Sequence, residues 1–325
     1  VLPQVPHRRP RPCQPAAERS SRIELDSIVA SRRCSSHILA RSPLQLSAEL
    51  AECVPAYSRR IPVLSVTPGK RNKRTDQICP WLDGEYARCE YMDKDGGAQV
   101  SPKELCEKLV AAAVEAGAEY RQGSVEGIET NAAQILTGVR VDGETIAASK
   151  FVVTMGPWST IASDWFSMDI PMTGIKSTSI VFKAKEPIEP FALFCGDDAR
   201  YGTHLEVYPR SSGEVYICGI GGSEYVTDQM LRAGAYPPGE VHADPARVEA
   251  AKAAFGAMTT QFGEPEVVQA CMRPCPPDAM PLMGAIPNVN GAYMSAGHNC
   301  WGILWAPVSG KAMSELLLDG ATSCV

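Results

Sequence analysis

The sequence predicts a mixed α/β fold, and three kinds of segment lead to that prediction. One short, wholly apolar segment, 151–154, is typical of a strand in a sheet that is covered on both faces. Apolar and polar residues alternate, as in antiparallel strands with one buried face, at 175–184, 203–209 and 214–219. Apolar residues recur at helical spacing at 101–117, 245–261 and 303–318.

The first predicted helix has the clearest start and stop signals. Ser101-Pro102-Lys103-Glu104 reads as a capping box with proline at the first helical position. Apolar residues then follow at helical spacing, and Gly117 can end the helix in the left-handed conformation. The segments 118–121 and 125–129 read as the next two strands.

Further strands and the ends of the later elements follow from the same criteria. The segments 267–272 and 292–295 are apolar enough to be strands. Gly156-Pro157-Trp158-Ser159 should break the strand at 151–154, because glycine and proline both interrupt regular structure. Gly320 is expected to stop the last helix.

The N-terminal segment, residues 1–78, differs from the rest of the 325-residue chain. Residues 1–80 hold 14 Lys and Arg against 6 Asp and Glu, whereas the remainder holds 17 against 31. The segment contains runs such as Arg8-Arg9-Pro10-Arg11-Pro12 and shows no sustained apolar periodicity. We therefore expect a poorly ordered basic segment, with ordered structure beginning near Trp81.

Three explanations for this basic segment stay open. It could be an organelle transit peptide, because such leaders are basic and rich in serine. It could be a nucleic-acid-binding arm, although no aromatic residues are interspersed with the basic ones, and no nucleic-acid partner is expected. The chain also starts at Val1 and has no methionine before Met92, which favours an incomplete or mis-assembled product. The expected location is the cytoplasm, or an organelle if the leader is authentic.

Composition argues against several other classes of protein. No run of about 18 apolar residues predicts a transmembrane helix. The 12 cysteines include no C-x-x-C pair, so a metal site is not expected and reduced thiols are. Ser159 and Ser309 lack the G-x-S-x-G setting of a hydrolase nucleophile.

The segment Gly297-His298-Asn299-Cys300-Trp301-Gly302-Ile303-Leu304 carries the strongest functional signal. It joins a predicted strand to the last helix, and its glycines allow a backbone to approach a ligand closely. Free N–H groups at the start of the helix would form a site for an anion or for an electron-accepting ring. A tight turn without a ligand is the alternative.

A series of motifs in sequence order makes the chain resemble a known family. Met272 to Gly284 contains R-P-x-x-x-D-x-x-P-x-x-G, and the segment from Gly297 continues as G-H-x-x-x-G-I-L-x-A-P-x-S-G. With the segments 99–102, 151–159 and 208–219, these motifs resemble the FAD-dependent D-amino-acid-oxidase, glycine-oxidase and sarcosine-oxidase family. The resemblance covers residues 80–320 or so.

The resemblance implies a domain organisation for residues 79–325. A partial FAD-binding, Rossmann-like domain would comprise 98–160 and 278–322. It would be interleaved with a mainly antiparallel substrate-binding sheet at about 170–275. In such a fold the flavin lies between the two parts, and the substrate lies beneath the sheet.

The resemblance also implies individual site residues. Arg273 matches the arginine that holds a substrate carboxylate, as guanidinium can with two parallel hydrogen bonds. An ion pair with Asp278 or another surface acid is the alternative. Val125 matches a position near the adenine, and Gly156 one near the pyrophosphate. The residues that would line the flavin ring are Gly297, His298, Asn299, Trp301, Gly302, Ile303 and Leu304.

Two departures from the family pattern matter for function. The family's glycine-rich dinucleotide loop, G-x-G-x-x-G, is absent from the sequence. The nearest candidate, Gly219 to Glu224, fails at the sixth position and reads as the end of a strand in the substrate sheet. Glu206 stands where amino-acid-oxidising relatives have an aromatic residue, which puts a simple amino-acid substrate in doubt.

The expected function is oxidation of a C–N bond in a small amine or amino acid. Hydride would pass to FAD, and oxygen or another acceptor would then reoxidise the flavin. The alternative is a catalytically inactive fragment or pseudoenzyme of the same fold that does not bind FAD tightly. His298 is expected to be structural or to contact the flavin, rather than to act as a base.

Overall fold

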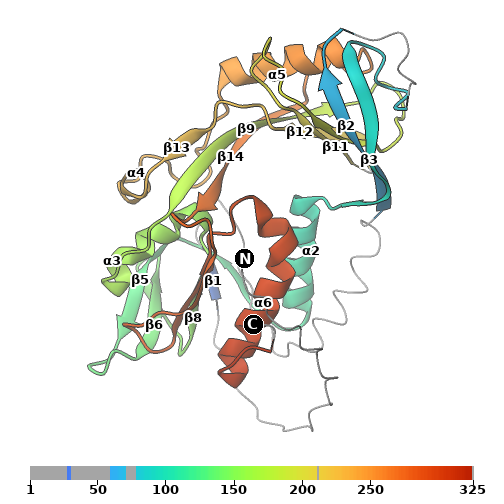
Figure 1. Ribbon diagram of the computed structural model, residues 1–325. Coiled ribbons are helices and arrows are strands. Elements are labelled where there is room, and N and C mark those ends of the chain that lie inside the picture. The colour runs from blue at the N-terminus through green and yellow to red at the C-terminus, as the bar shows by residue number, and fades with distance from the viewer. Residues whose placement is uncertain (1–27, 31–58, 71–77, 211, 324–325) are drawn as a thin grey trace, which may run out of the picture.

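The computed structural model describes residues 28–30, 59–70, 78–210 and 212–323 (Figure 1). The chain forms two parts, an arched sheet with one covering helix and a smaller α/β part beneath it. No described helix combines enough length and hydropathy to cross a bilayer.

The arched sheet has eight strands, in the order β13-β9-β12-β11-β10-β2-β3, with β14 on the other edge of β9. All pairs are antiparallel except β10 with β2, which confirms the predicted antiparallel sheet. The strands are β2 (Arg59–Pro68), β3 (Tyr86–Gln99), β9 (Thr173–Lys183), β10 (Ala192–Cys195), β11 (Glu206–Pro209), β12 (Glu214–Cys218), β13 (Glu224–Val226) and β14 (Val267–Cys275).

Helix α5 (Pro245–Met258) covers the convex face of this sheet. Asp244 caps it by accepting hydrogen bonds from the N–H groups of Ala246 and Arg247, at 2.8 and 3.4 Å. Ile180 and Ile217, which are fully buried, pack with Phe255 of α5 in the larger hydrophobic core. Alternation along the strands therefore turns the neighbouring side chains toward the concave face.

The smaller part contains three short sheets, β15-β16-β8, β5-β6-β7 and the parallel pair β1-β4. Their strands are β1 (Ile28–Ala30), β4 (Tyr120–Gln122), β5 (Val125–Thr130), β6 (Leu136–Val141), β7 (Glu144–Ala147), β8 (Phe151–Val153), β15 (Leu282–Ala285) and β16 (Ala292–Ala296). The helices of this part are α2 (Pro102–Glu115), the 3-10 helix η1 (Gly156–Ala162), α3 (Ser163–Phe166), the 3-10 helix η2 (Asn299–Trp301) and α6 (Gly302–Asp319). A second core gathers Val153, Phe166 and Met294.

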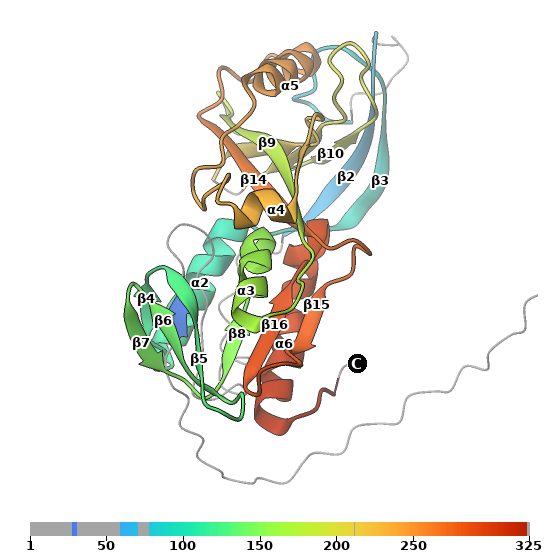
Figure 2. The same ribbon diagram turned by 90° about the vertical axis from the view of Figure 1, so that its left-hand side faces the viewer.

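A third, small cluster joins the two parts. Trp158 of η1 packs against Val226, Leu231 and Met272, which belong to β13, α4 (Asp228–Arg232) and β14. The indole N–H of Trp158 donates a hydrogen bond to the backbone carbonyl of Tyr236 at 2.8 Å. Figure 2 shows α4 directly above α3 at this junction.

Ordered structure begins earlier than Trp81, so that boundary was wrong. Strand β2 starts at Arg59, and its residues Leu64 and Val66 are fully buried in the larger core. Register shifts between Ile61, Val63 and Leu64 interrupt the alternation of this strand, which hides the pattern from a period-two search. The remaining expectations for residues 1–58 lie outside the described residues, apart from strand β1.

The first helix begins and ends where predicted, but its start has a different structure. Ser101 occupies the N-cap, yet its side chain makes no capping hydrogen bond. Gly117, with φ +98°, follows the helix in the left-handed conformation as expected. The hairpin β6–β7 was not predicted, although four of the six residues of β6 are buried; β7 is short and mostly exposed.

Candidate active site

Two turns of the smaller part lie at the same edge of one sheet. Strands β8 and β16 are parallel, with Val153 opposite Met294. Gly156 and Gly297 each follow three residues later, with φ of +57° and +85°. Ligands of open α/β sheets bind beyond the carboxyl ends of parallel strands, so this edge is a candidate binding site.

Gly297 brings its turn against the end of the arched sheet. A Cβ atom at this position would lie 2.5 Å from Cγ of Pro276, the residue that follows β14. Only glycine satisfies both this approach and the positive φ. The turn at the start of α6 is thereby held close to the strand that carries Arg273.

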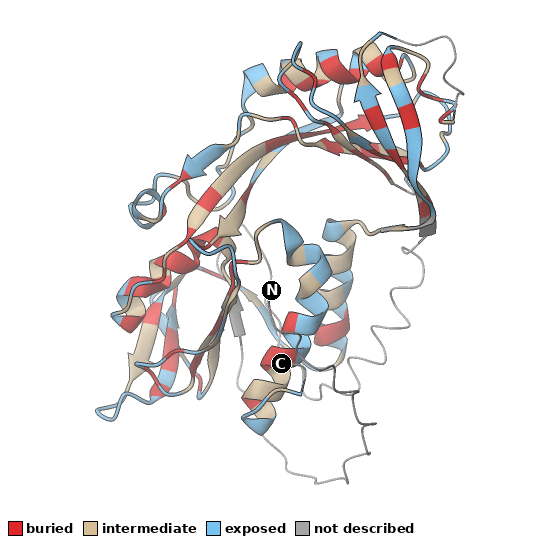
Figure 3. Ribbon diagram, in the orientation of Figure 1, coloured by how far each residue is buried: buried red, intermediate tan, exposed pale blue. Residues whose placement is uncertain are grey.

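The first half of α6 is apolar and largely exposed (Figure 3). Trp301 is 51% exposed and Leu304 is 67% exposed. Ile303, which lies between them in the sequence, is exposed as well. Trp301 also stacks on Trp305, with ring centroids 5.9 Å apart. Exposed apolar side chains concentrated at a helix start are typical of a surface that receives an apolar ligand or partner.

His298 is tied to the same helix. Its Nε2 lies 2.8 Å from Oγ of Ser309, a buried residue two turns into α6. Burial lowers the pKa of the imidazole below its ordinary value. A neutral imidazole that is hydrogen-bonded to a hydroxyl group holds the turn in place, which is a structural role.

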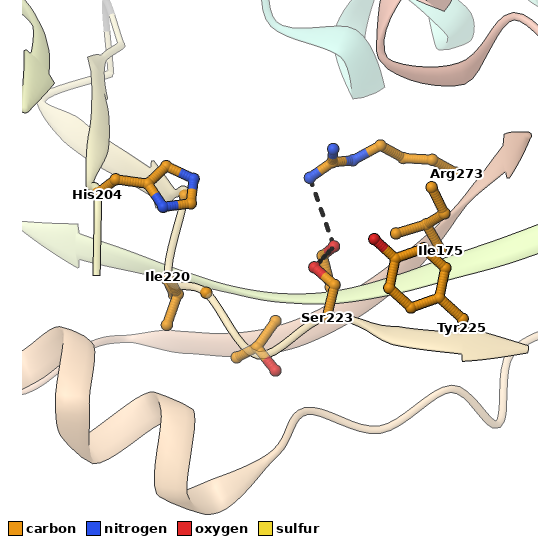
Figure 4. Close-up of a pocket in the computed structure, with 10 residues that line it drawn as sticks. Ile175, His204, Ile220, Ser223, Tyr225 and Arg273 are labelled. Carbon is orange, nitrogen blue, oxygen red and sulfur yellow. Dashed lines mark hydrogen bonds between the residues drawn. The ribbon is translucent and has the colours of Figure 1, made fainter. Parts of the chain in front are cut away.

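A pocket of about 250 Å³ lies in the arched sheet beside Arg273 (Figure 4). The pocket opens beside the loop that joins β12 to β13. Along this stretch β9 borders the loop instead of a strand. The residues around it come from segments far apart in the chain: Ile175, Ser177, Thr178, His204, Gly219, Ile220, Gly221, Ser223, Tyr225 and Arg273.

Arg273 is held by hydroxyl groups within this pocket. Its guanidinium donates to Oγ of Ser177 at 3.4 Å, and that oxygen lies 2.9 Å from Oγ of Ser223. In the described part of the chain Arg273 forms no ion pair, so the alternative pairing with Asp278 is not realised. Asp278 instead accepts a hydrogen bond from the N–H of Met280.

The glycine-rich loop 219–223 joins β12 to β13 of the arched sheet, directly after the strand whose end was predicted here. Gly219 has φ +68°, and a Cβ atom there would lie 2.4 Å from the carbonyl oxygen of His204. Arg247 of α5 supports the loop from the convex side by donating to the carbonyls of Gly202, at 2.6 Å, and Ile220. The loop is thus closely packed on its convex side.

The structure brings some of the expected site residues together and leaves one apart. Gly156 and the segment from Gly297 to Leu304 meet at the edge of β8 and β16. Val125 begins β5 in a different sheet, where it packs against the second core. His204, Ser177 and Ser223 were missed, because no local motif marks residues that only the sheet brings to Arg273.

Comparisons with known proteins identify the family. A family model described as FAD dependent oxidoreductase (DAO) matches residues 19–316, and the chain belongs to this family. The match begins within the basic N-terminal segment.

Individual relatives cover different shares of the chain. It is 30% identical over 184 residues to the putative oxidoreductase TDA3 of Saccharomyces cerevisiae, a match that covers 54% of the chain but only 32% of that relative. It is 27% identical over 278 residues to the uncharacterized oxidoreductase YurR of Bacillus subtilis, covering 82% of the chain and 68% of the relative.

The fold is also that of solved members of the family. Glycine oxidase from Geobacillus kaustophilus superimposes with a TM-score of 0.64 at 19% identity, over 88% of this chain and 82% of that one. At this identity the similarity shows a shared fold.

The two turns leave open space beside the start of α6, where the ring of FAD would lie. A Cβ atom at Gly156 would meet nothing within 4 Å, and one at Gly302 would meet only His298, at 3.8 Å. A planar ring can therefore approach the backbone beside the apolar start of α6. The diphosphate half finds no matching loop, because the sequence contains no G-x-G-x-x-G and the loop at Gly219 lies in the other sheet.

Proposed function

We propose that the protein oxidises a C–N bond of a small amine or amino acid, with FAD as the electron acceptor. One observation carries the proposal: Arg273, a cation without an ion-pair partner in the described residues, lines a pocket on β14, and Pro276 directly after this strand packs against the turn at Gly297. A half-buried guanidinium of this kind is suited to an anionic group of a ligand.

Arg273 would bind the substrate carboxylate and so position the reacting carbon. Ser177 and Ser223 orient the guanidinium from one side, leaving its other N–H groups free to form two parallel hydrogen bonds. The pocket of about 250 Å³ would exclude bulk water around the pair. Holding the substrate in a fixed orientation lowers the entropic part of the activation barrier.

The turn and the start of α6 would hold the flavin ring. When bound, the flavin supplies the acceptor for the substrate's hydride, and oxygen or another acceptor then takes up the electrons. The N-terminal end of α6 favours negative charge nearby through its free N–H groups and dipole. The proposed ring contacts are Gly297, His298, Asn299, Trp301, Gly302, Ile303 and Leu304, whereas Val125 would lie near the adenine and Gly156 near the pyrophosphate.

The alternative is a non-catalytic protein of the same fold that does not retain FAD. Such a protein would lack the glycine-rich loop of the family pattern, which these 325 residues do not contain. A visible absorption spectrum of the purified chain, taken before and after adding FAD and again after gel filtration, separates the two. Bands near roughly 370 and 450 nm that persist support the proposal; a chain that stays colourless supports the alternative.

Replacing Arg273 tests the carboxylate role directly. We expect Arg273→Met to weaken binding of norleucine by about 10- to 100-fold, because a charged hydrogen-bonded pair contributes about 1.5–3 kcal/mol. Binding of pentylamine, which lacks the carboxylate, should change little. Isothermal titration calorimetry with both enantiomers of norleucine measures the effect.

Arg232→Met provides the matched control. Arg232 lies on α4 and pairs with Asp164 at the surface, where an ion pair contributes little to stability. This variant should bind norleucine like the wild type. Equal norleucine affinity in the Arg273→Met and wild-type proteins would refute the carboxylate role.

A further inference from the structure

Glu206 and Arg273 lie on the same face of the arched sheet. Val207 and Ile217, which pair between β11 and β12, are fully buried in the larger core on the convex side. Alternation then turns Glu206 toward the concave face. Ile180 of β9 points into the larger core on the convex side, so Ile175, an odd number of residues away, points to the concave face. Arg273 pairs with Ile175 and therefore points to the concave face as well.

The carboxylate of Glu206 is fixed by two donors on one oxygen. The Tyr208 hydroxyl donates to Oε2 at 2.7 Å, and the Cys218 thiol approaches the same oxygen at 3.5 Å. Burial, and after it the charge of Glu206, raises the pKa of Cys218 to about 12. Burial and the interaction with Glu206 also raise the pKa of Tyr208 well above its ordinary value. Both groups therefore keep their protons. Oε1 of Glu206 has no hydrogen-bond partner in the described residues.

Glu206 also has no basic partner in the described part of the chain. The neighbouring cations are engaged elsewhere: Arg210 pairs with Glu214 at 3.4 Å, and Lys183 donates to the carbonyl of Ser212. Glu206 is half-buried, and a carboxylate withdrawn from water is stabilised by an opposite charge. A cation supplied by a ligand would provide that charge.

The separation of the two charges sets the size of such a ligand. The guanidinium of Arg273 reaches Ser177 on β9, and Glu206 lies on β11, two strands away. Ser177 also lies two residues along β9 from the position level with Glu206. About 4.8 Å between strands and about 3.4 Å per residue together place the two groups on the order of 12 Å apart. Cys218, which lies between them, is within electrostatic reach of both.

We propose that Glu206 binds a second, cationic group of the substrate, so that the preferred substrates are basic amino acids of about the length of lysine. Arg273 binds the carboxylate at one end, and Oε1 of Glu206 accepts hydrogen bonds from the cation at the other. The inference rests on the proposed function for the position of the carboxylate. It also explains why a carboxylate on this face is anchored by Tyr208.

The test compares ligands that differ only at the far end. Lysine, N6-acetyl-lysine and norleucine, each as both enantiomers, are titrated into the full chain with FAD added, and heat is measured. We expect lysine to bind at least about tenfold more tightly than the other two, as one charged hydrogen-bonded pair provides. The acetylated ligand keeps the length but not the charge, so this comparison needs no variant.

Two variants assign the preference to Glu206. Glu206→Gln keeps an oxygen acceptor for Tyr208 but loses the charge, and should reduce the lysine preference to less than about threefold without changing norleucine affinity. Glu214→Gln is the matched control, because Glu214 lies on the same face but is paired with Arg210. It should leave the preference intact.

The outcomes distinguish the inference from the proposed function. Equal affinity for lysine and norleucine, no binding of lysine, or a preference that survives Glu206→Gln would each overturn the inference. If Arg273→Met leaves all affinities unchanged while Glu206→Gln removes the preference, the cation-binding role of Glu206 stands, and the carboxylate role of Arg273 fails together with the ligand length argued from it.

Discussion

The hydrogen bond between His298 and Ser309 connects the turn of the candidate site to protein stability. Burial lowers the pKa of His298 below the ordinary value of 6.5. Between the folded and unfolded pKa values the unfolded chain binds more protons. The stabilising contribution is therefore fully present above about pH 6.5 and is lost as the pH falls toward the folded pKa.

We expect His298→Gln to remove this part of the pH dependence. Urea unfolding at about pH 7.5 and about pH 5.5 gives the free energy of unfolding of each protein. The wild type should lose more stability than the variant over this interval, because only the wild type carries the buried imidazole. A variant with the same loss as the wild type would show that another group controls the dependence.

Among the short elements, the loop 219–223 shows how backbone conformation shapes the pocket. Gly219→Ala should destabilise the protein by more than about 1 kcal/mol, because a positive φ costs about 1–2 kcal/mol for a residue with a Cβ atom. The atom would also lie 2.4 Å from the carbonyl oxygen of His204. Thermal and urea unfolding measure the loss.

Gly256→Ala is the matched control for this substitution. Gly256 lies within α5, is exposed, and has nothing within 4 Å of an added Cβ atom. Alanine at a helical position of this kind should stabilise the protein by about 0.5–1 kcal/mol. Equal effects of the two substitutions would contradict the conformational argument for the loop.

Whether an element could be predicted depended on how local its signal was. Strand β12 alternates regularly because one face packs toward α5, and the sequence shows this alternation, whereas β9 is buried continuously from Thr178 to Phe182. Strand β2 carries as many core residues as β12, but its register shifts break the period. The capping box at Ser101 has the right letters, yet the side chain makes no capping bond.

The residues of the candidate site also differ in how local their sequence signal is. Arg273 and the turn at Gly297 belong to continuous motifs and were identified from the sequence. Ser177, Ser223 and His204 line the pocket of Arg273 only because β9, the loop before β13 and the loop before β11 meet in the folded sheet. Long-range pairing of this kind has no signature within any one segment.

At the scale of the whole molecule, two hydrophobic cores are joined through a small cluster at Trp158. The larger core lies between the arched sheet and α5, and the second lies within the smaller part. The candidate site uses both parts, since Arg273 comes from the sheet and the turn at Gly297 from the part below. Its geometry therefore depends on a fixed relation between the two cores.

Trp158→Ala tests how strongly this cluster couples the two cores. We expect a loss of about 3–5 kcal/mol, because a buried tryptophan is removed and the carbonyl of Tyr236 loses its donor. The coupling should weaken as well, so calorimetry should resolve two unfolding transitions in the variant where the wild type shows one. Trp158→Phe, which fills most of the space, should keep a single transition at a lower temperature. If the alanine variant also unfolds in one transition, the cores are coupled by β9 and β14 and not by Trp158.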